Sequence, residues 1–192
     1  MKIRLLMLPF AALAPLLFWS ASASAACWKP VPSAKSLTFT AQQGGAPFPG
    51  EFKRYTAQLC LDDKDPAKDK LQVDLDLDSV DTGLDEMDAA LKGDDFFDTA
   101  KYPKGSFVSD SMQQVSPGHY SVTGKLTLKG VTKVLTVPFT WTPAKDGKRA
   151  RLDAKTTLNR RDYGIGKGQW DDPQYVGLTV DVVFAIDFVP AP

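Results

Sequence analysis

The most constraining feature of this chain is a long segment near its C-terminus in which every second residue is apolar. The apolar positions are Val176, Leu178, Val180, Val182, Phe184, Ile186 and Phe188. Successive side chains of a β-strand point to opposite faces, so this spacing predicts one strand with a single buried face. At about 3.3 Å per residue the strand would be roughly 40 Å long, whereas most strands contain about 5–6 residues. Such strands closed into a barrel would enclose a tall apolar tube, which suits a long apolar ligand better than an enzyme pocket.

Residues 1–25 are typical of a cleaved secretory signal peptide. Lys2 and Arg4 precede an apolar run from Leu5 to Trp19, and Ala23-Ser24-Ala25 supplies the small residues of a cleavage site. The apolar run contains two prolines and is shorter than the roughly 20 residues of a membrane-spanning helix. We therefore expect an exported protein cleaved near Ala25, with residues 26–192 as one domain and no transmembrane segment left.

The charge balance excludes several partners. Lysine and arginine together number 23, and so do aspartate and glutamate. The basic residues form no stripe for nucleic acid and no polybasic anchor for anionic lipid. Instead, charged residues alternate with apolar ones along the strands, which is typical of a solvated sheet face.

The chain contains two cysteines, Cys27 and Cys60. In an oxidising compartment two cysteines are expected to form a disulfide. The alternatives are an acylated Cys27, as in a lipoprotein, and two free thiols. Ser24 stands where lipoprotein processing sites usually have an aliphatic residue, which favours the disulfide.

The sequence of the mature chain predicts strands with one inserted helix. Apolar residues at helical spacing predict a helix from Asp85 to Asp98. Alternation and turn residues predict seven strands before the C-terminal one: Leu37–Gln42, Glu51–Leu61, Leu71–Asp78, Gly105–Val115, Tyr120–Lys129, Val131–Trp141 and Arg149–Leu158.

Eight strands joined mostly by hairpins predict an all-β fold, an antiparallel closed barrel that leaves no strand edge exposed. At this size the interior holds either packed side chains or one ligand. A two-sheet sandwich is the alternative fold. The many large aromatic residues spread over the strands favour a cavity.

The remaining motifs favour structural roles, and no metal, cofactor or catalytic residue is expected. His119 follows a Pro-Gly turn, and one histidine cannot build a typical zinc site. Asp74, Asp76 and Asp78 lie at strand spacing, unlike a calcium loop. The glycines from Gly164 to Gly168 lack the following helix that a phosphate-binding loop needs.

Several segments together resemble the YceI-like family of exported lipid- or polyisoprenoid-binding proteins, from about Ser36 to Val189. The resemblance lies in Phe39 with Gly50-Glu51-Phe52, Asp78 to Gly83, Asp95 to Asp98 with Tyr102-Pro103, Gly124 to Lys133, and Arg161 to Gly166. It implies an elongated, lipocalin-like eight-stranded barrel in the periplasm, often dimeric, that encloses a long-chain isoprenoid and has no catalytic residues. Some relatives are associated with membrane b-type cytochromes, so the resemblance also implies a quinone-like cargo and a cytochrome partner as alternatives.

On this basis the chain is expected to be a periplasmic carrier of a polyisoprenoid or related amphiphilic lipid. The expected tail contacts are Phe39, Phe52, Leu75, Phe96, Phe97, Phe107, Leu126, Phe139, Trp141 and Phe184. Arg160 and Arg161 are candidates for binding a diphosphate head group through bidentate hydrogen bonds, or are surface arginines paired with nearby aspartates. The competing hypotheses are a hydrolase acting on an envelope lipid and a solid-core module that docks on a membrane cytochrome.

Overall fold

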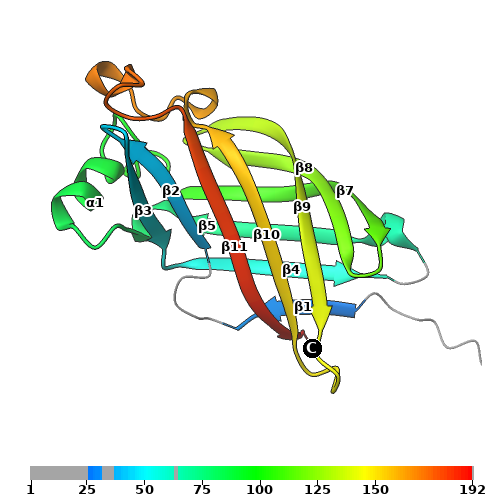
Figure 1. Cartoon of the computed structure of the whole chain (residues 1–192). Helices are drawn as coiled ribbons and strands as arrows, with labels where there is room; N and C mark the ends of the chain where they lie inside the picture. The colour runs from blue at the N-terminus through cyan, green and yellow to red at the C-terminus, as the bar shows by residue number, and fades with distance from the viewer. Residues whose placement is uncertain (1–25, 32–36, 63–64, 192) are drawn as a thin grey trace, which may run out of the picture.

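Eight antiparallel strands close into a barrel in the computed structural model, which describes residues 26–31, 37–62 and 65–191 (Figure 1). The hydrogen-bonded ring consists of β1 (Ala26–Pro30), β4 (Tyr55–Leu61), β5 (Lys70–Asp76), β7 (Lys104–Ser116), β8 (His119–Leu128), β9 (Val131–Pro143), β10 (Ala150–Asn159) and β11 (Thr179–Pro190). β1 pairs with both β4 and β11, and this double pairing closes the ring. The predicted closed barrel is confirmed and the sandwich is excluded. The predicted signal peptide lies outside the described residues.

Along one edge, β11 pairs with two different strands, β2 (Leu37–Gln43) and β1. It pairs through residues 181–184 with β2 and through residues 188–190 with β1. β2 turns at Gly44-Gly45 into β3 (Ala46–Phe52), which pairs with the short β6 (Val80–Asp81). β2 and β3 therefore continue the wall at the end of the barrel that lies away from β1 (Figure 1).

Most helical segments gather at the end where β2 and β3 lie (Figure 1). They are α1 (Asp85–Lys92) and the short 3-10 helices η2 (Leu77–Ser79), η3 (Arg160–Tyr163) and η4 (Gly168–Asp171), while η1 (Pro66–Lys68) links β4 to β5 at the other end. None of the helices in the described part of the chain is long and apolar enough to cross a membrane.

The alternation in the last strand is confirmed, although the strand is shorter than predicted. Val180, Val182 and Phe184 face the interior, and Ile186 and Phe188 are fully buried. The strand begins at Thr179 because the preceding residues form a loop. Within that loop Val176 forms an isolated bridge to Gln43 in place of a continuous ladder, and its N–H donates to the Asp172 carbonyl.

The predicted strand from Glu51 to Leu61 is in fact two strands, β3 and β4, separated at Lys53-Arg54. These two residues bond to η2 instead of continuing the ladder. The Lys53 and Arg54 N–H groups donate to the carbonyl and the hydroxyl of Ser79, respectively. β1 was also not predicted, because Pro30 and Pro32 mark residues 26–32 as an irregular lead-in.

The predicted helix exists but ends at Lys92, six residues early. Gly93 leaves the helix with an extended backbone, and its carbonyl accepts hydrogen bonds from the N–H groups of Phe96 and Asp98. Asp98 has φ 50°, in the left-handed region. This tight turn directs Phe96 and Phe97 toward the barrel, where a continued helix would have carried them past it.

One end of the barrel is a packed core, here called the base cluster. Its buried members are Ala57, Leu59, Leu71, Met112, Val122, Phe139, Trp141, Ala150, Leu152, Ile186 and Phe188. The Trp141 ring lies edge-on to the rings of Trp28 and Phe188, with centroid distances of 5.2 and 5.6 Å. Trp28 of β1 therefore packs on Trp141 of β9, which in turn contacts Phe188 of β11 at this end of the barrel.

The expected disulfide between Cys27 and Cys60 is present. The two residues are directly opposite each other in the pairing of β1 with β4. The bond therefore fastens β1, which has only short ladders on either side, to the base of the barrel.

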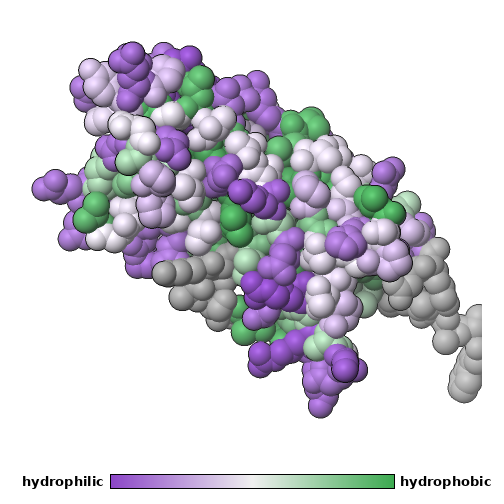
Figure 2. Space-filling view, viewed as in Figure 1, coloured by the Kyte–Doolittle hydropathy of each residue, from purple (hydrophilic) through white to green (hydrophobic). Residues whose placement is uncertain are grey.

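The face of the molecule shown in Figure 2 carries mainly hydrophilic and intermediate residues. Among the described residues, the large exposed apolar ones are Leu84, Val108, Val115, Val134, Tyr175 and Val183. In Figure 2 the apolar residues form small separate spots among hydrophilic ones. The apolar content of the chain is thus directed mainly inward.

Replacing both Cys27 and Cys60 by alanine is expected to lower the free energy of unfolding by about 3–4 kcal/mol. The reason is that the loop between the two cysteines would no longer be closed, and therefore constrained, in the unfolded chain. Urea denaturation of the wild-type and double-variant proteins measures this difference. A change below about 1 kcal/mol would show that the bond contributes little to closure of the barrel.

Candidate functional site

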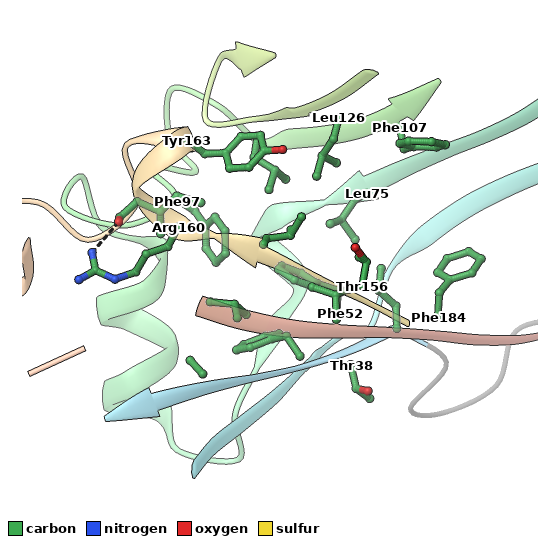
Figure 3. A pocket seen from close by; sticks show the side chains of 18 of the residues that line it. Thr38, Phe52, Leu75, Phe97, Phe107, Leu126, Thr156, Arg160, Tyr163 and Phe184 are labelled. Atoms are coloured by element: carbon green, nitrogen blue, oxygen red, sulfur yellow. Dashed lines mark hydrogen bonds between the residues drawn. The ribbon is translucent and has the colours of Figure 1, made fainter. Parts of the chain in front are cut away.

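A cavity of about 260 Å³ occupies the barrel between the base cluster and the end that carries α1 (Figure 3). Its walls are almost wholly apolar. They include the inward residues Val73 and Leu75 of β5, Val137 of β9 and Ala154 of β10. These side chains are only half buried although they point inward, because no side chain fills the space in front of them.

Segments outside the barrel strands cover the cavity and are here called the cap. It consists of residues 85–102, which contain α1, and residues 160–178, which contain η3 and η4. Met87, Ala90 and Leu91 of α1 line the cavity, as do Trp170 and Val176 of the second segment. The rings of Phe96 and Trp170 lie in contact, with centroids 5.8 Å apart, and join the two segments.

Rings from three elements form a continuous row along one side of the cavity. The Phe39 and Phe52 centroids are 5.6 Å apart, and the Phe52 and Phe97 centroids are also 5.6 Å apart. Phe39 in turn lies over Gly50, where a Cβ atom would collide with the ring. The glycine of the Gly50-Glu51-Phe52 motif therefore makes room for an aromatic residue that lines the cavity.

The structure brings most of the expected tail contacts together. Nine of the ten line the cavity: Phe39, Phe52, Leu75, Phe96, Phe97, Phe107, Leu126, Phe139 and Phe184. Trp141 does not, because it lies further along β9 and is packed in the base cluster. Phe139 belongs to both regions and marks the boundary between them.

The Arg160 guanidinium is fully engaged by the backbone. It donates hydrogen bonds of 2.7–3.2 Å to six carbonyl oxygens, those of Ile165, Gly166, Trp170, Asp171, Val176 and Gly177. Arg160 is 3% exposed, and burial, with the neighbouring Arg161 cation, lowers its pKa. All five guanidinium N–H groups have acceptors, so Arg160 holds the cap in place and leaves no N–H for a diphosphate.

The glycine-rich run is explained by this arrangement. Gly166 has φ 78°, and a Cβ atom there would collide with the Arg160 guanidinium. The run therefore wraps a buried cation, and it is not a phosphate-binding loop. Arg161 is exposed, pairs with Asp171 at 2.8 Å, and is not among the residues that line the cavity.

Further bonds tie the two cap segments to each other and to the barrel. The Asp95 carbonyl accepts hydrogen bonds from the N–H groups of Gly166 and Lys167, at 2.8 and 3.0 Å. Lys129, in the turn between β8 and β9, donates from Nζ to the Asp94 carbonyl at 2.6 Å. Burial lowers the pKa of Lys129. The cap is thus bonded through backbone carbonyls, which a sequence pattern does not reveal.

The other candidate motifs have structural partners. His119 is exposed and shares a hydrogen bond of 3.3 Å with Thr140. Asp76 pairs with Arg54 at 2.8 Å on the outer surface. Within the described ranges, no group of three or more His, Cys, Asp or Glu residues is placed to hold a metal ion.

Tyr163 and Thr156 bring hydroxyl groups to the cavity and were not among the expected site residues. Tyr163 is 3% exposed and packs with Leu77 and Leu128. Burial, with a smaller effect of the Asp162 carboxylate, raises the pKa of its phenol. Its aromatic ring suggested core packing, and only the fold shows that its hydroxyl reaches the cavity.

Arg160→Met is expected to lower the free energy of unfolding by about 3–5 kcal/mol, because the loop carbonyls would lose a buried charged donor. Arg161→Met should change it by no more than about 0.5 kcal/mol, since exposed ion pairs contribute little. Urea denaturation compares the two neighbours, and hydrogen exchange of residues 160–178 locates the effect. Equal losses of unfolding free energy in the two variants would contradict the conclusion that Arg160 holds the cap in place.

The chain was compared with known proteins. The YceI-like domain matches residues 28–188. Protein YceI of Escherichia coli is 36% identical over 137 residues, which cover 69% of this chain and 71% of the relative. The crystal structure of Burkholderia cenocepacia BcnA matches with a TM-score of 0.74 and 30% identity, over 83% of this chain and 95% of that one.

A polyisoprenoid-binding domain from Saccharophagus degradans, implicated in plant cell wall breakdown, matches with a TM-score of 0.68 over 85% of this chain and 98% of that one. At 17% identity this likeness concerns the fold. The domain match and the relatives of higher identity carry the assignment. The chain therefore belongs to the YceI-like family.

Proposed function

We propose that this protein binds a long-chain polyisoprenoid or a related amphiphilic lipid, and carries or sequesters it without catalysing a reaction. The observation that carries the proposal is the hollow, almost wholly apolar part of the barrel. The description of the Saccharophagus degradans domain as polyisoprenoid-binding supports it. A quinone with an isoprenoid tail falls within the same ligand class.

The dimensions of the cavity fit an apolar chain. A cavity of roughly 150 Å³ lined by apolar side chains stays dry and holds a ligand of benzene size. The volume here is about 260 Å³, so the cavity admits a larger ligand. Burying roughly 300 Å² of ligand surface would contribute about 7 kcal/mol before the costs of ordering the chain.

The chemistry of the lining supports binding over hydrolysis. Among the described residues that line the cavity, none is His, Cys, Asp, Glu or Lys. The one charged residue is Arg160, whose N–H groups are all engaged. A hydrolase would need a nucleophile and a general base or acid within hydrogen-bond reach of each other. The other polar side chains of this lining carry hydroxyl or amide groups, which do not act as a general base at neutral pH.

We further propose that the protein acts in the periplasm. The signal-peptide pattern supports export, and the Cys27–Cys60 disulfide supports an oxidising compartment. A homodimer and a docking site for a membrane cytochrome remain predictions from the family resemblance.

Filling the cavity is expected to abolish lipid binding without unfolding the barrel. Ala154 lies on β10 between Phe139 and Phe184, and its small side chain leaves open space. Ala154→Phe should reduce affinity for a prenyl lipid at least tenfold, while thermal unfolding occurs at an unchanged or higher temperature. Lys155→Phe puts the same ring on the outer face of the same strand and should bind normally. Normal binding by Ala154→Phe would contradict the proposed site.

Affinity is expected to rise with the length of the prenyl tail and then to level off, because each added isoprene unit buries apolar surface only until the cavity is full. Prenyl alcohols of increasing length, titrated by calorimetry, test this dependence. Mass spectrometry of the same mixtures follows the ligands over time. Affinity that is indifferent to tail length, or turnover of the ligand, would defeat the proposal.

A further inference from the structure

Tyr163 presents a buried polar atom to the cavity. It is the last residue of η3 and is 3% exposed. Figure 3 shows its ring directed into the cavity, with the hydroxyl toward Leu126. The ring belongs to an apolar cluster with Leu77 and Leu128. The hydroxyl is therefore held in a fixed direction by packing.

The Tyr163 hydroxyl makes no hydrogen bond to any of the described residues. Buried tyrosine hydroxyls usually find a partner, because a buried donor without one costs free energy. The nearby cation does not supply an interaction, since the Arg160 N–H groups all donate to backbone carbonyls. The hydroxyl therefore faces the space that a ligand would fill.

Water is a poor partner for this hydroxyl. A buried water molecule typically needs two to four polar neighbours. The described lining also contains Thr38, Thr156, Ser106, Gln42 and Gln43. In Figure 3 Thr38 and Thr156 lie away from the Tyr163 hydroxyl, and Leu126 lies beside it. The surrounding walls are apolar, and an apolar cavity stays dry. A polar atom on the ligand itself is the partner that fits.

We propose that the Tyr163 hydroxyl donates a hydrogen bond to an uncharged oxygen of the bound lipid, so that the site selects neutral prenyl lipids over prenyl diphosphates. This inference rests on the proposed function and deepens it by naming the head group. An alcohol, a ketone or an ester oxygen meets the requirement. This proposal replaces the expectation that Arg160 and Arg161 bind a diphosphate, because neither guanidinium faces the cavity with a free N–H.

The electrostatics of the site agree with a neutral head group. Burial raises the pKa of the Tyr163 phenol, which means that this environment disfavours a negative charge. A diphosphate placed at the same point would meet the same cost of desolvation. Its counter-charge would have to come from Arg160, whose donors are already engaged.

The test compares three ligands with the same saturated tail of twenty carbons: the alcohol phytanol, phytanyl diphosphate and the hydrocarbon phytane. The wild-type protein should bind the alcohol about tenfold more tightly than the hydrocarbon, since one neutral hydrogen bond is typically worth this much. The diphosphate should bind more weakly than the alcohol. Fluorescence of the cavity-lining tryptophan Trp170 reports occupancy in each titration.

Tyr163→Phe removes only the hydroxyl. It should reduce affinity for phytanol about tenfold and leave affinity for phytane unchanged. Tyr175→Phe is the matched control, because Tyr175 is 59% exposed and lies outside the cavity lining. Without ligand, the Tyr163→Phe protein should melt at the same or a higher temperature, since a buried hydroxyl without a partner has been removed. That readout separates a loss of binding from a loss of folding.

Two outcomes would overturn the inference. One is tightest binding of the diphosphate, and the other is an equal loss of alcohol and hydrocarbon binding in Tyr163→Phe. If alcohol and hydrocarbon bind equally well to the wild-type protein and Ala154→Phe abolishes both, the inference fails and the proposed lipid binding stands. If none of the three ligands binds the wild-type protein, the proposed function itself fails.

Discussion

The hydrogen bonding of Arg160 is the interaction on which the cavity depends. Side chains fill this barrel at only one end. The other end is covered by segments that do not belong to the β-ladders of the barrel. Here a single buried cation provides six hydrogen bonds to the carbonyl oxygens of residues 165–177. A buried charge is tolerated only where its donors are satisfied, and the loop satisfies them all. The same contacts that stabilise the cation therefore fix the loop, and the loop in turn positions Tyr163, Trp170 and Val176 at the cavity.

The two ends of the barrel meet different physical requirements. At the base, Trp28, Trp141 and Phe188 fill the interior, and the Cys27–Cys60 bond fastens the shortest strand of the closed ring. At the cap, buried and half-buried rings line a space that is not filled. Core packing at the base supplies stability through burial, so the cap end can leave apolar surface uncovered without loss of the fold. Binding a lipid there would cover that surface.

Alternation along the strands made the barrel predictable. The period of two from Val180 to Phe188 and the hairpin turns determine both the strands and their inward faces. The departures have local causes. Pro30 and Pro32 concealed β1, and the backbone bonds of Lys53 and Arg54 to Ser79 divided one predicted strand into two. The helix ended early because Gly93 turns the chain, which a pattern of apolar residues does not register.

The residues that line the cavity were largely predictable from the sequence. The level along the barrel at which the cavity begins and the roles of its polar residues were not. Phe139 and Trp141 share a strand and a face, yet one borders the cavity and the other is packed in the base. Alternation gives the face of a side chain, but not the level at which the barrel becomes hollow. Arg160 and Arg161 look equivalent as a sequence pair. Their different roles depend on carbonyl oxygens of residues up to Gly177, and such backbone partners leave no trace in residue types.

The separation between the base cluster and the cap has an evolutionary consequence. Trp28, Trp141, Ile186 and Phe188 hold the base together without lining the cavity, whereas Leu71, Val122, Phe139 and Leu152 belong to both regions. Substitutions at wall residues outside the base cluster, such as Thr156, can therefore reshape the cavity while the base residues that do not line it continue to specify the barrel. A lineage built on this plan can change the shape of its cavity without passing through unfolded intermediates.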